Sequence, residues 1–222
     1  MLTVYKEKAP IQGVLFDMDG LVVDTECLYS RFWMEACHFY GFPMSREQSL
    51  EMRSLNHTLG QKKLTDLFGT GADYETIRAK RIELMDAFVE SQGVAAKPGV
   101  FRLLEVLDQR HIPRAVTSSS PQARIKACLE PLGLYHRFGP IITAYDVPHG
   151  KPDPDIYLKG AQVLGLEPGV CLALEDSPSG ILSASRAGCL SVVIPDQDQP
   201  GADILSLVYA RADCLTDVID LL

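Results

Sequence analysis

Short apolar runs that end in polar residues recur along the chain and predict buried strands. The first run, Ile11 to Phe16, is too short for a helix and is followed directly by Asp17. Beyond residue 98, strand-like runs alternate with helix-like stretches. These later runs cover residues 112–117, 141–143, 170–174 and 190–194. This alternation predicts an α/β fold, a doubly wound parallel sheet with helices on both faces.

The segment between residues 25 and 92 has a different pattern. It contains no β-rich run, and apolar residues such as Leu28, Phe32 and Ala36 recur at helical spacing. We therefore expect an all-helical domain inserted into the α/β core. The expected boundaries are residues 1–24 and 94–222 for the core and 25–93 for the helical domain.

Three strand-to-helix junctions share one pair of residue types. The pairs are Ser120-Pro121, Asp153-Pro154 and Ser177-Pro178. Ser and Asp are good N-caps and proline suits the first helical position, so each pair predicts the start of a helix. In open α/β sheets, ligands bind beyond the carboxyl ends of the strands. The residues just after the predicted strands are therefore the first candidates for chemistry.

Acidic residues follow two of the predicted strands. Asp17 and Asp19 come after the first strand, and Glu175 and Asp176 follow the run 170–174. Two unit charges 4 Å apart repel by about 4 kcal/mol at an effective dielectric constant near 20, so converging carboxylates need a cation. Oxygen ligands without nearby His or Cys favour a hard ion, and Mg²⁺ is the expected cofactor. Taken singly, each acidic pair also fits a plain turn or a helix start.

Four motifs in order resemble those of the haloacid dehalogenase-like hydrolase superfamily. Residues 16–26, FDMDGLVVDTE, resemble its first motif, and Ser118 resembles its second. Lys151 resembles the third, and Glu175-Asp176 the fourth. The helical insertion is similar to the cap of the subgroup that contains β-phosphoglucomutases and sugar-phosphate phosphatases. The resemblance spans residues 11–194 and implies a Rossmann-like core with a substrate-selecting helical cap.

The resemblance also implies catalytic roles. Asp17 is the expected nucleophile, which forms an aspartyl-phosphate, and Asp19 the expected general acid and base. Ser118 and Lys151 are expected to bind the phosphoryl group. Family members that lack an acid at the position of Asp19 tend toward carbon–halogen or carbon–phosphorus chemistry, so this chain resembles the phosphate-ester enzymes.

The implied metal site and substrate contacts complete the prediction. Mg²⁺ is expected among Asp17, the Asp19 carbonyl oxygen and Asp176, with Glu175 either a direct ligand or just outside the first shell. The candidate substrate-binding residues are Gly20, Ser119, Tyr29, Arg53, Asn56 and His57. A surface or core role is at least as consistent with the last four.

The cap region separates a phosphatase from a mutase. Tyr29 stands where β-phosphoglucomutases have a His, and Met52 and Asn56 align with a mutase Lys and Arg. A mutase needs such cations to bind a second phosphate, a role that Arg53 or His57 could also fill in this chain. We therefore expect a Mg²⁺-dependent phosphoric monoester hydrolase that acts on a small phosphorylated metabolite, such as a sugar phosphate. The alternatives are a β-phosphoglucomutase-type phosphotransferase and a non-catalytic binding protein on the same fold.

Composition and charge narrow the partners and the compartment. The 222 residues carry 21 Lys and Arg against 29 Asp and Glu, a net charge of −8, which argues against nucleic acid as the main partner. No apolar run approaches the ~20 residues that a membrane-spanning helix needs, and we see no secretory signal. The six scattered cysteines are expected to be reduced thiols. We expect a cytoplasmic monomer.

Overall fold

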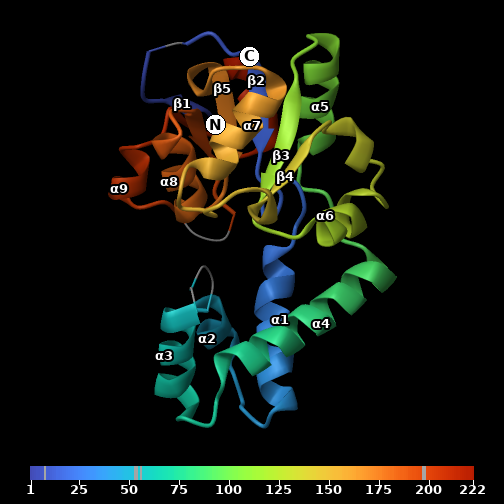
Figure 1. Ribbon diagram of the computed structural model, residues 1–222, viewed down its shortest axis with the longest axis vertical. Coiled ribbons are helices and arrows are strands. Elements are labelled where there is room, and N and C mark those ends of the chain that lie inside the picture. The colour runs from blue at the N-terminus through green and yellow to red at the C-terminus, as the bar shows by residue number, and fades with distance from the viewer. Residues whose placement is uncertain (8, 53–54, 56, 197–198) are drawn as a thin grey trace. The chain divides into compact units, whose positions relative to one another are not determined.

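The chain forms two compact units in the computed structural model, which describes residues 1–7, 9–52, 55, 57–196 and 199–222. Unit 1 contains Met1–Asp24 and Ala95–Leu222, and unit 2 contains Thr25–Val94 (Figure 1). The end of unit 2 at Val94 lies one residue beyond the boundary expected from the sequence.

A single β-sheet forms the centre of unit 1. Its strands are β1 (Thr3–Val4), β2 (Gly13–Phe16), β3 (Arg114–Ser118), β4 (Ile141–Thr143), β5 (Cys171–Glu175), β6 (Leu190–Val193) and β7 (Ala210–Arg211). They lie in the order β1-β7-β6-β5-β2-β3-β4, and only β1 pairs antiparallel. Strands β2 and β5 are fully buried, as their continuous apolar runs predict for central parallel strands.

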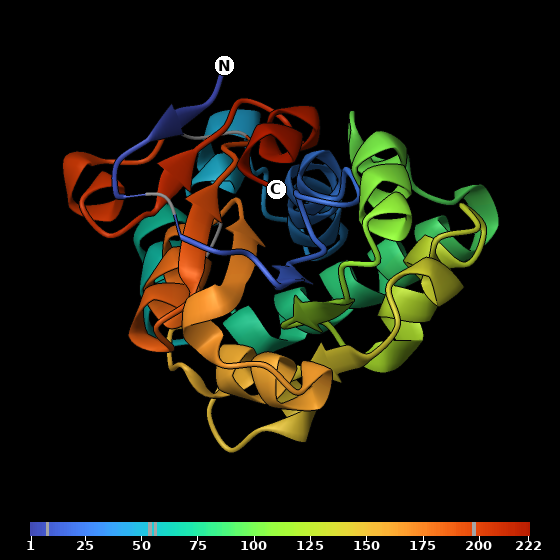
Figure 2. The ribbon, with the colours of Figure 1, turned by 90° about the horizontal axis from the view of Figure 1, so that it is seen from above.

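Helices cover both faces of this sheet. They are α5 (Val100–Gln109), α6 (Gln122–Leu129), α7 (Asp155–Leu164), α8 (Pro178–Arg186) and α9 (Ala202–Leu205). Helices α7 and α8 pack together on one face, and α5 with the 3₁₀ helix Leu215–Leu221 lies on the other (Figure 2). The predicted doubly wound α/β fold is confirmed.

Unit 2 consists of helices in its described residues. They are α1 (Glu26–Phe39), α2 (Arg46–Leu50), α3 (His57–Phe68) and α4 (Tyr74–Gln92). The N-cap of α2 is a capping box in which Ser45 and Gln48 bond each other's backbone, and Asp73 caps α4. Trp33, Leu64 and other buried apolar side chains form the core between these helices. The all-helical insertion is therefore confirmed.

The predicted helix starts are correct at only one of the three junctions. Ser177 is the N-cap of α8 and accepts a hydrogen bond from the Gly180 N–H, with Pro178 at the first helical position. At α6 and α7 the N-cap is the proline itself, Pro121 or Pro154. The Ser120 side chain does not cap α6 because its hydroxyl bonds Asp19 instead.

The described residues contain no helix long and apolar enough to cross a membrane. Cys37, Cys171 and Cys189 lie in buried clusters of apolar side chains, where a thiol packs as a small hydrophobic group.

Candidate active site

The loop after β2 presents Asp17 and Asp19 at the carboxyl end of the sheet. The Asp17 N–H donates to the Leu174 carbonyl oxygen at 3.0 Å, which ties the loop to β5. Met18 is fully buried, and its carbonyl oxygen accepts hydrogen bonds from the N–H groups of Val22 and Val23. Gly20 has a φ of 79°, a left-handed conformation that glycine adopts without strain. The loop therefore turns back sharply at Gly20, and Asp17 and Asp19 flank the buried Met18 in the chain.

The end of β3 supports the second of these carboxylates. Ser118 is fully buried, and its hydroxyl accepts a hydrogen bond of 3.0 Å from the Ser120 N–H. The Ser120 hydroxyl donates to Asp19 Oδ2 at 2.8 Å. The sequence pattern predicts Ser120 only as a helix cap, whereas in the structure its hydroxyl contacts Asp19, the predicted general acid and base. A hydroxyl just after the Ser118 motif was the available signal.

Lys151 joins three strand ends. Its ammonium donates to Asp17 Oδ1 at 2.5 Å, to Glu175 Oε1 at 2.6 Å and to the Thr117 carbonyl oxygen at 3.0 Å. The Lys151 side chain is only 5% exposed. A buried ammonium needs such compensation, because leaving a charge unpaired in the interior is costly. The cation therefore has a fixed place beside Asp17.

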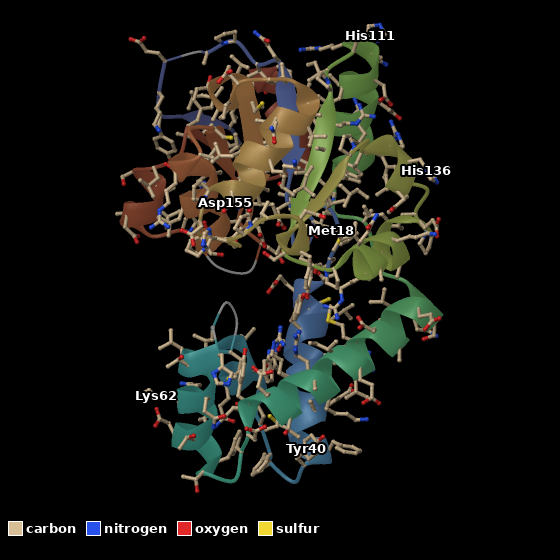
Figure 3. All side chains as sticks on the ribbon, in the orientation of Figure 1. Met18, Tyr40, Lys62, His111, His136 and Asp155 are labelled. Carbon is tan, nitrogen blue, oxygen red and sulfur yellow. The ribbon has the colours of Figure 1, made fainter. Side chains whose placement is uncertain are left out.

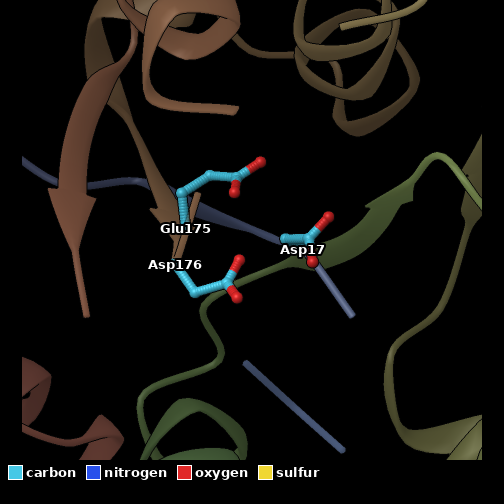
Figure 4. Close-up of side chains that lie close together, drawn as sticks. All are labelled: Asp17, Glu175 and Asp176. Atoms are coloured by element: carbon cyan, nitrogen blue, oxygen red, sulfur yellow. The ribbon is translucent and has the colours of Figure 1, made fainter. Parts of the chain in front are cut away.

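Glu175 and Asp176 complete the acidic cluster at the end of β5. Carboxylate oxygens of Asp17, Glu175 and Asp176 all lie within 4.8 Å of one another (Figure 4). Glu175 is completely buried and Asp176 half-buried. The Ser177 hydroxyl donates to Glu175 Oε2 at 3.2 Å. The four motifs therefore converge at one end of the sheet.

Negative charge exceeds positive charge in this cluster. Burial raises the pKa of Asp17 from its usual 3.8 to about 8. The Lys151 ammonium acts in the opposite direction, but the nearby Glu175 and Asp19 carboxylates raise this pKa and offset part of that effect. Burial alone would lower the pKa of Lys151, but Asp17 and Glu175 raise it well above its ordinary value. Lys151 is therefore protonated and positively charged. Asp17 is ionised at neutral pH only if a further positive charge, such as a bound cation, lies beside it.

The donor set fits a small hard cation. Three carboxylates converge, and none of the groups in the cluster is a nitrogen or sulfur ligand. A divalent ion bound there would supply the positive charge that Asp17 needs. Figure 3 shows that Met18 and Asp155 lie toward one end of unit 1 and His111 toward the other. That histidine lies before β3 and is remote from the cluster.

The other candidate substrate contacts have different surroundings. Ser119 is exposed and Gly20 buried, both next to the cluster in sequence. In unit 2, Tyr29 is half-buried with the Arg81 guanidinium 4.8 Å from its ring centroid. His57 is exposed, with Nε2 3.6 Å from Glu75 Oε1. The remaining candidates, Arg53 and Asn56, lie outside the described residues.

Met52 bears on the comparison with mutases. It is 2% exposed and packs in the apolar core of unit 2. An apolar side chain buried in this way cannot supply the cation that the resemblance places there in β-phosphoglucomutases.

Comparisons with known proteins agree with this geometry. The haloacid dehalogenase-like hydrolase model matches residues 11–188. Hexitol phosphatase A of Escherichia coli (strain K12) is 34% identical over 92% of this chain and 93% of its own length. The β-phosphoglucomutase of Bacillus subtilis (strain 168) is 30% identical over 88% of each chain.

A solved structure supports the same relationship. A haloacid dehalogenase-like protein from Agrobacterium tumefaciens (strain C58) has a TM-score of 0.80 and 25% identity, covering 95% of this chain and 97% of that one. The resemblance stated from the four motifs is thereby confirmed: this chain belongs to the haloacid dehalogenase-like hydrolase family.

Proposed function

We propose that this protein is a Mg²⁺-dependent phosphatase that hydrolyses a small phosphorylated metabolite through an aspartyl-phosphate on Asp17. One observation carries the proposal. Asp17 is held by Lys151, while Asp19, two residues away, is held separately by Ser120. Two carboxylates with different partners suit two different roles, a nucleophile and an acid–base.

The first chemical step uses Asp17 as the nucleophile. Its carboxylate oxygen forms a bond to phosphorus, and the bond to the ester oxygen of the leaving group breaks. Asp19 gives a proton to that oxygen, so the product leaves as a neutral alcohol. Lys151 and Ser118 bind the phosphoryl oxygens, and the backbone N–H of Ser119 donates a further hydrogen bond to them.

The second step returns the enzyme to its starting state. Asp19, now ionised, takes a proton from a water molecule, and the water oxygen attacks the phosphorus of the aspartyl-phosphate. Inorganic phosphate leaves, and the Asp17 carboxylate is restored. Mg²⁺, held by Asp17, Asp176 and the Asp19 carbonyl oxygen with Glu175 beside them, would supply positive charge to the phosphoryl oxygens.

We assign the choice of substrate to unit 2 acting as a cap. Hexitol phosphatase A supports a phosphorylated polyol or sugar as the substrate class. Tyr29 and His57 are the described residues that we propose as contacts, and Gly20 contributes through the loop after β2. We further propose that the protein works as a monomer, and that it works in the cytoplasm, where scattered cysteines stay reduced.

Phosphate release from a panel of esters tests the proposal. The panel contains sugar, hexitol and nucleoside monophosphates, each assayed with saturating Mg²⁺ and with EDTA. We expect Mg²⁺-dependent release from several sugar or hexitol phosphates and background rates in EDTA. Full activity without a divalent ion would contradict the proposed metal site.

A second arm of the assay addresses the mutase. β-Glucose 1-phosphate is supplied with and without glucose 1,6-bisphosphate, and both glucose 6-phosphate and inorganic phosphate are followed. Buried Met52 leads us to expect no stimulation by the bisphosphate. Bisphosphate-dependent isomerisation with little phosphate released would replace the phosphatase by a mutase. Ligand binding without turnover of any ester would instead indicate a binding protein.

A further inference from the structure

Tyr157 contacts Glu175 of the acidic cluster, although it belongs to none of the four sequence motifs. It lies in the first turn of α7, and its side chain is fully buried. Its hydroxyl donates to Glu175 Oε1 at 2.5 Å. The Lys151 ammonium lies 5.2 Å from the centroid of its ring, within the range of a cation–π interaction. One side chain thus contacts both members of the Lys151–Glu175 ion pair.

Close packing of α7 on the sheet brings the Tyr157 side chain within contact distance of Glu175 and Lys151. One turn after Tyr157, Gly160 faces the sheet, and a Cβ there would lie 2.9 Å from Thr117 Cγ2 and 3.0 Å from Leu15 Cδ2. Only a residue without a side chain lets the helix lie so near β2 and β3. The Tyr157 ring is therefore held in the apolar cluster that covers these strands.

Both oxygens of the Glu175 carboxylate are held by hydrogen bonds, and α8 packs closely against the carboxyl group. Its Oε1 accepts hydrogen bonds from Lys151 and Tyr157, and its Oε2 accepts one from Ser177. On the side of α8, a Cβ on Gly180 would overlap the carboxyl group.

We propose that Tyr157 is a positioning residue that fixes the Glu175 carboxylate and, through it, the Lys151 ammonium beside Asp17. The role rests on the phosphatase function proposed above. Lys151 has three acceptors within 3.0 Å, and its place relative to Asp17 depends on where each acceptor lies. Without the Tyr157 hydroxyl, Oε1 of Glu175 loses one of its two donors. The ammonium is then less precisely aligned with the nucleophile and the phosphoryl group.

The Tyr157→Phe variant tests this role because it removes the hydroxyl and keeps the ring. At saturating Mg²⁺ we expect kcat to fall roughly 10-fold, with KM within about twofold of wild type, since small misalignment of reacting groups mainly slows the chemical step. Tyr209→Phe is the matched control. Tyr209 is also buried in unit 1, and its hydroxyl accepts only a 3.4 Å bond from the Ala9 N–H, among the bonds the structure records. The kcat of the Tyr209→Phe variant should equal that of the wild type.

A double-mutant cycle with Glu175→Gln distinguishes positioning from a purely structural role. If Tyr157 acts through Glu175, Tyr157→Phe should change kcat less than twofold in the Glu175→Gln background. A full 10-fold loss in that background would overturn the proposal. So would a Tyr157→Phe enzyme with wild-type kcat, whether or not its melting temperature falls.

A crystal structure of Tyr157→Phe provides a readout that needs no turnover. We expect the Glu175 carboxylate or the Lys151 ammonium to leave the position seen in wild type. Unchanged positions of both groups would overturn the proposal. Wild-type protein that hydrolyses no ester would defeat the proposed function alone, and the crystal structure would still decide the role of Tyr157.

Discussion

The strand ends of unit 1 and the helices of unit 2 differ in how strongly their candidate residues are fixed. In unit 1, hydrogen bonds join predicted residues far apart in sequence, such as Lys151 and Asp17, 134 positions apart. In unit 2, Tyr29 and His57 lie on separate helices; Tyr29 contacts Arg81, and His57 contacts Glu75 and the Tyr74 ring. The first region is a buried cluster of charged groups joined across strands, whereas the candidates in unit 2 are held by contacts within that unit.

Burial accounts for this difference. Asp17, Lys151 and Glu175 are almost inaccessible to water, so each charge requires a partner at short distance, and most replacements leave a charge uncompensated. His57 has 62% of its side chain exposed, and water compensates for the loss of any one contact. Substitutions should therefore affect turnover in unit 1 and substrate preference in unit 2.

Asp17→Asn should have the largest effect. An amide is a poor nucleophile, so we expect kcat to fall by on the order of 10⁴-fold or more. Because Asn has nearly the same shape, the folded structure should remain, as circular dichroism would show. Retention of more than a tenth of wild-type turnover would contradict the assignment of the nucleophile.

Asp19→Asn should follow, with a loss of roughly 10²- to 10⁴-fold in kcat, the usual contribution of general acid–base catalysis. The loss in kcat/KM, which reports the first chemical step alone, should be smallest for esters with good leaving groups, such as p-nitrophenyl phosphate, in which departure needs little protonation. Ser120→Ala should give a weaker version of the same pattern, because its hydroxyl only orients Asp19. Equal losses for good and poor leaving groups would argue against protonation by Asp19 in the first step.

Substitutions in unit 2 should have smaller effects of a different kind. We expect His57→Ala and Tyr29→Phe to change KM by up to about 10-fold, to different extents for different sugar phosphates, with little change in kcat. His38→Ala on the exposed side of α1 is the control, since its Nδ1 lies 3.2 Å from the Met34 carbonyl oxygen of the same helix. Uniform effects on every ester would remove these two residues from the set of specificity contacts.

The last prediction concerns the stability of the metal-free protein rather than its turnover. The pKa of Asp17 rises from 3.8 in the unfolded chain to about 8 in the folded one, so between pH 4 and 8 the folded state binds more protons. The free energy of unfolding should therefore fall as pH rises through this range. Because Asn does not titrate, the stability of Asp17→Asn relative to wild type should increase from pH 5 to pH 8. Urea unfolding in EDTA measures this difference, and a constant difference would contradict the raised pKa.

The sequence predicted which residues meet at the strand ends better than it predicted the residues that support them. Apolar runs ending in Asp17, Ser118 and Glu175 were sufficient, because parallel strands bring their carboxyl ends to one edge of the sheet. The Ser120–Asp19 and Tyr157–Glu175 bonds were not foreseen. They depend on the loop conformation around Gly20 and on the approach of α7 at Gly160, which local patterns do not encode.

The wrong helix start at α6 has the same origin. Ser120 has the right residue type for a cap, but its hydroxyl bonds a residue 101 positions away in sequence. The substrate contacts that we propose for unit 2 are likewise not encoded in its helical periodicity, since a helix repeat indicates which face is buried and not what the exposed face binds.

Trapping the phosphorylated enzyme tests the central claim most directly. Asp19→Asn enzyme, slowed in the hydrolysis step, is mixed with a p-nitrophenyl ester and Mg²⁺, quenched in acid within a turnover and digested for mass spectrometry. The account predicts one added phosphoryl group on the peptide that contains Asp17, and none in the Asp17→Asn, Asp19→Asn double variant. A phosphoryl group on another residue, or phosphate released in a burst from enzyme that is never labelled, would contradict it.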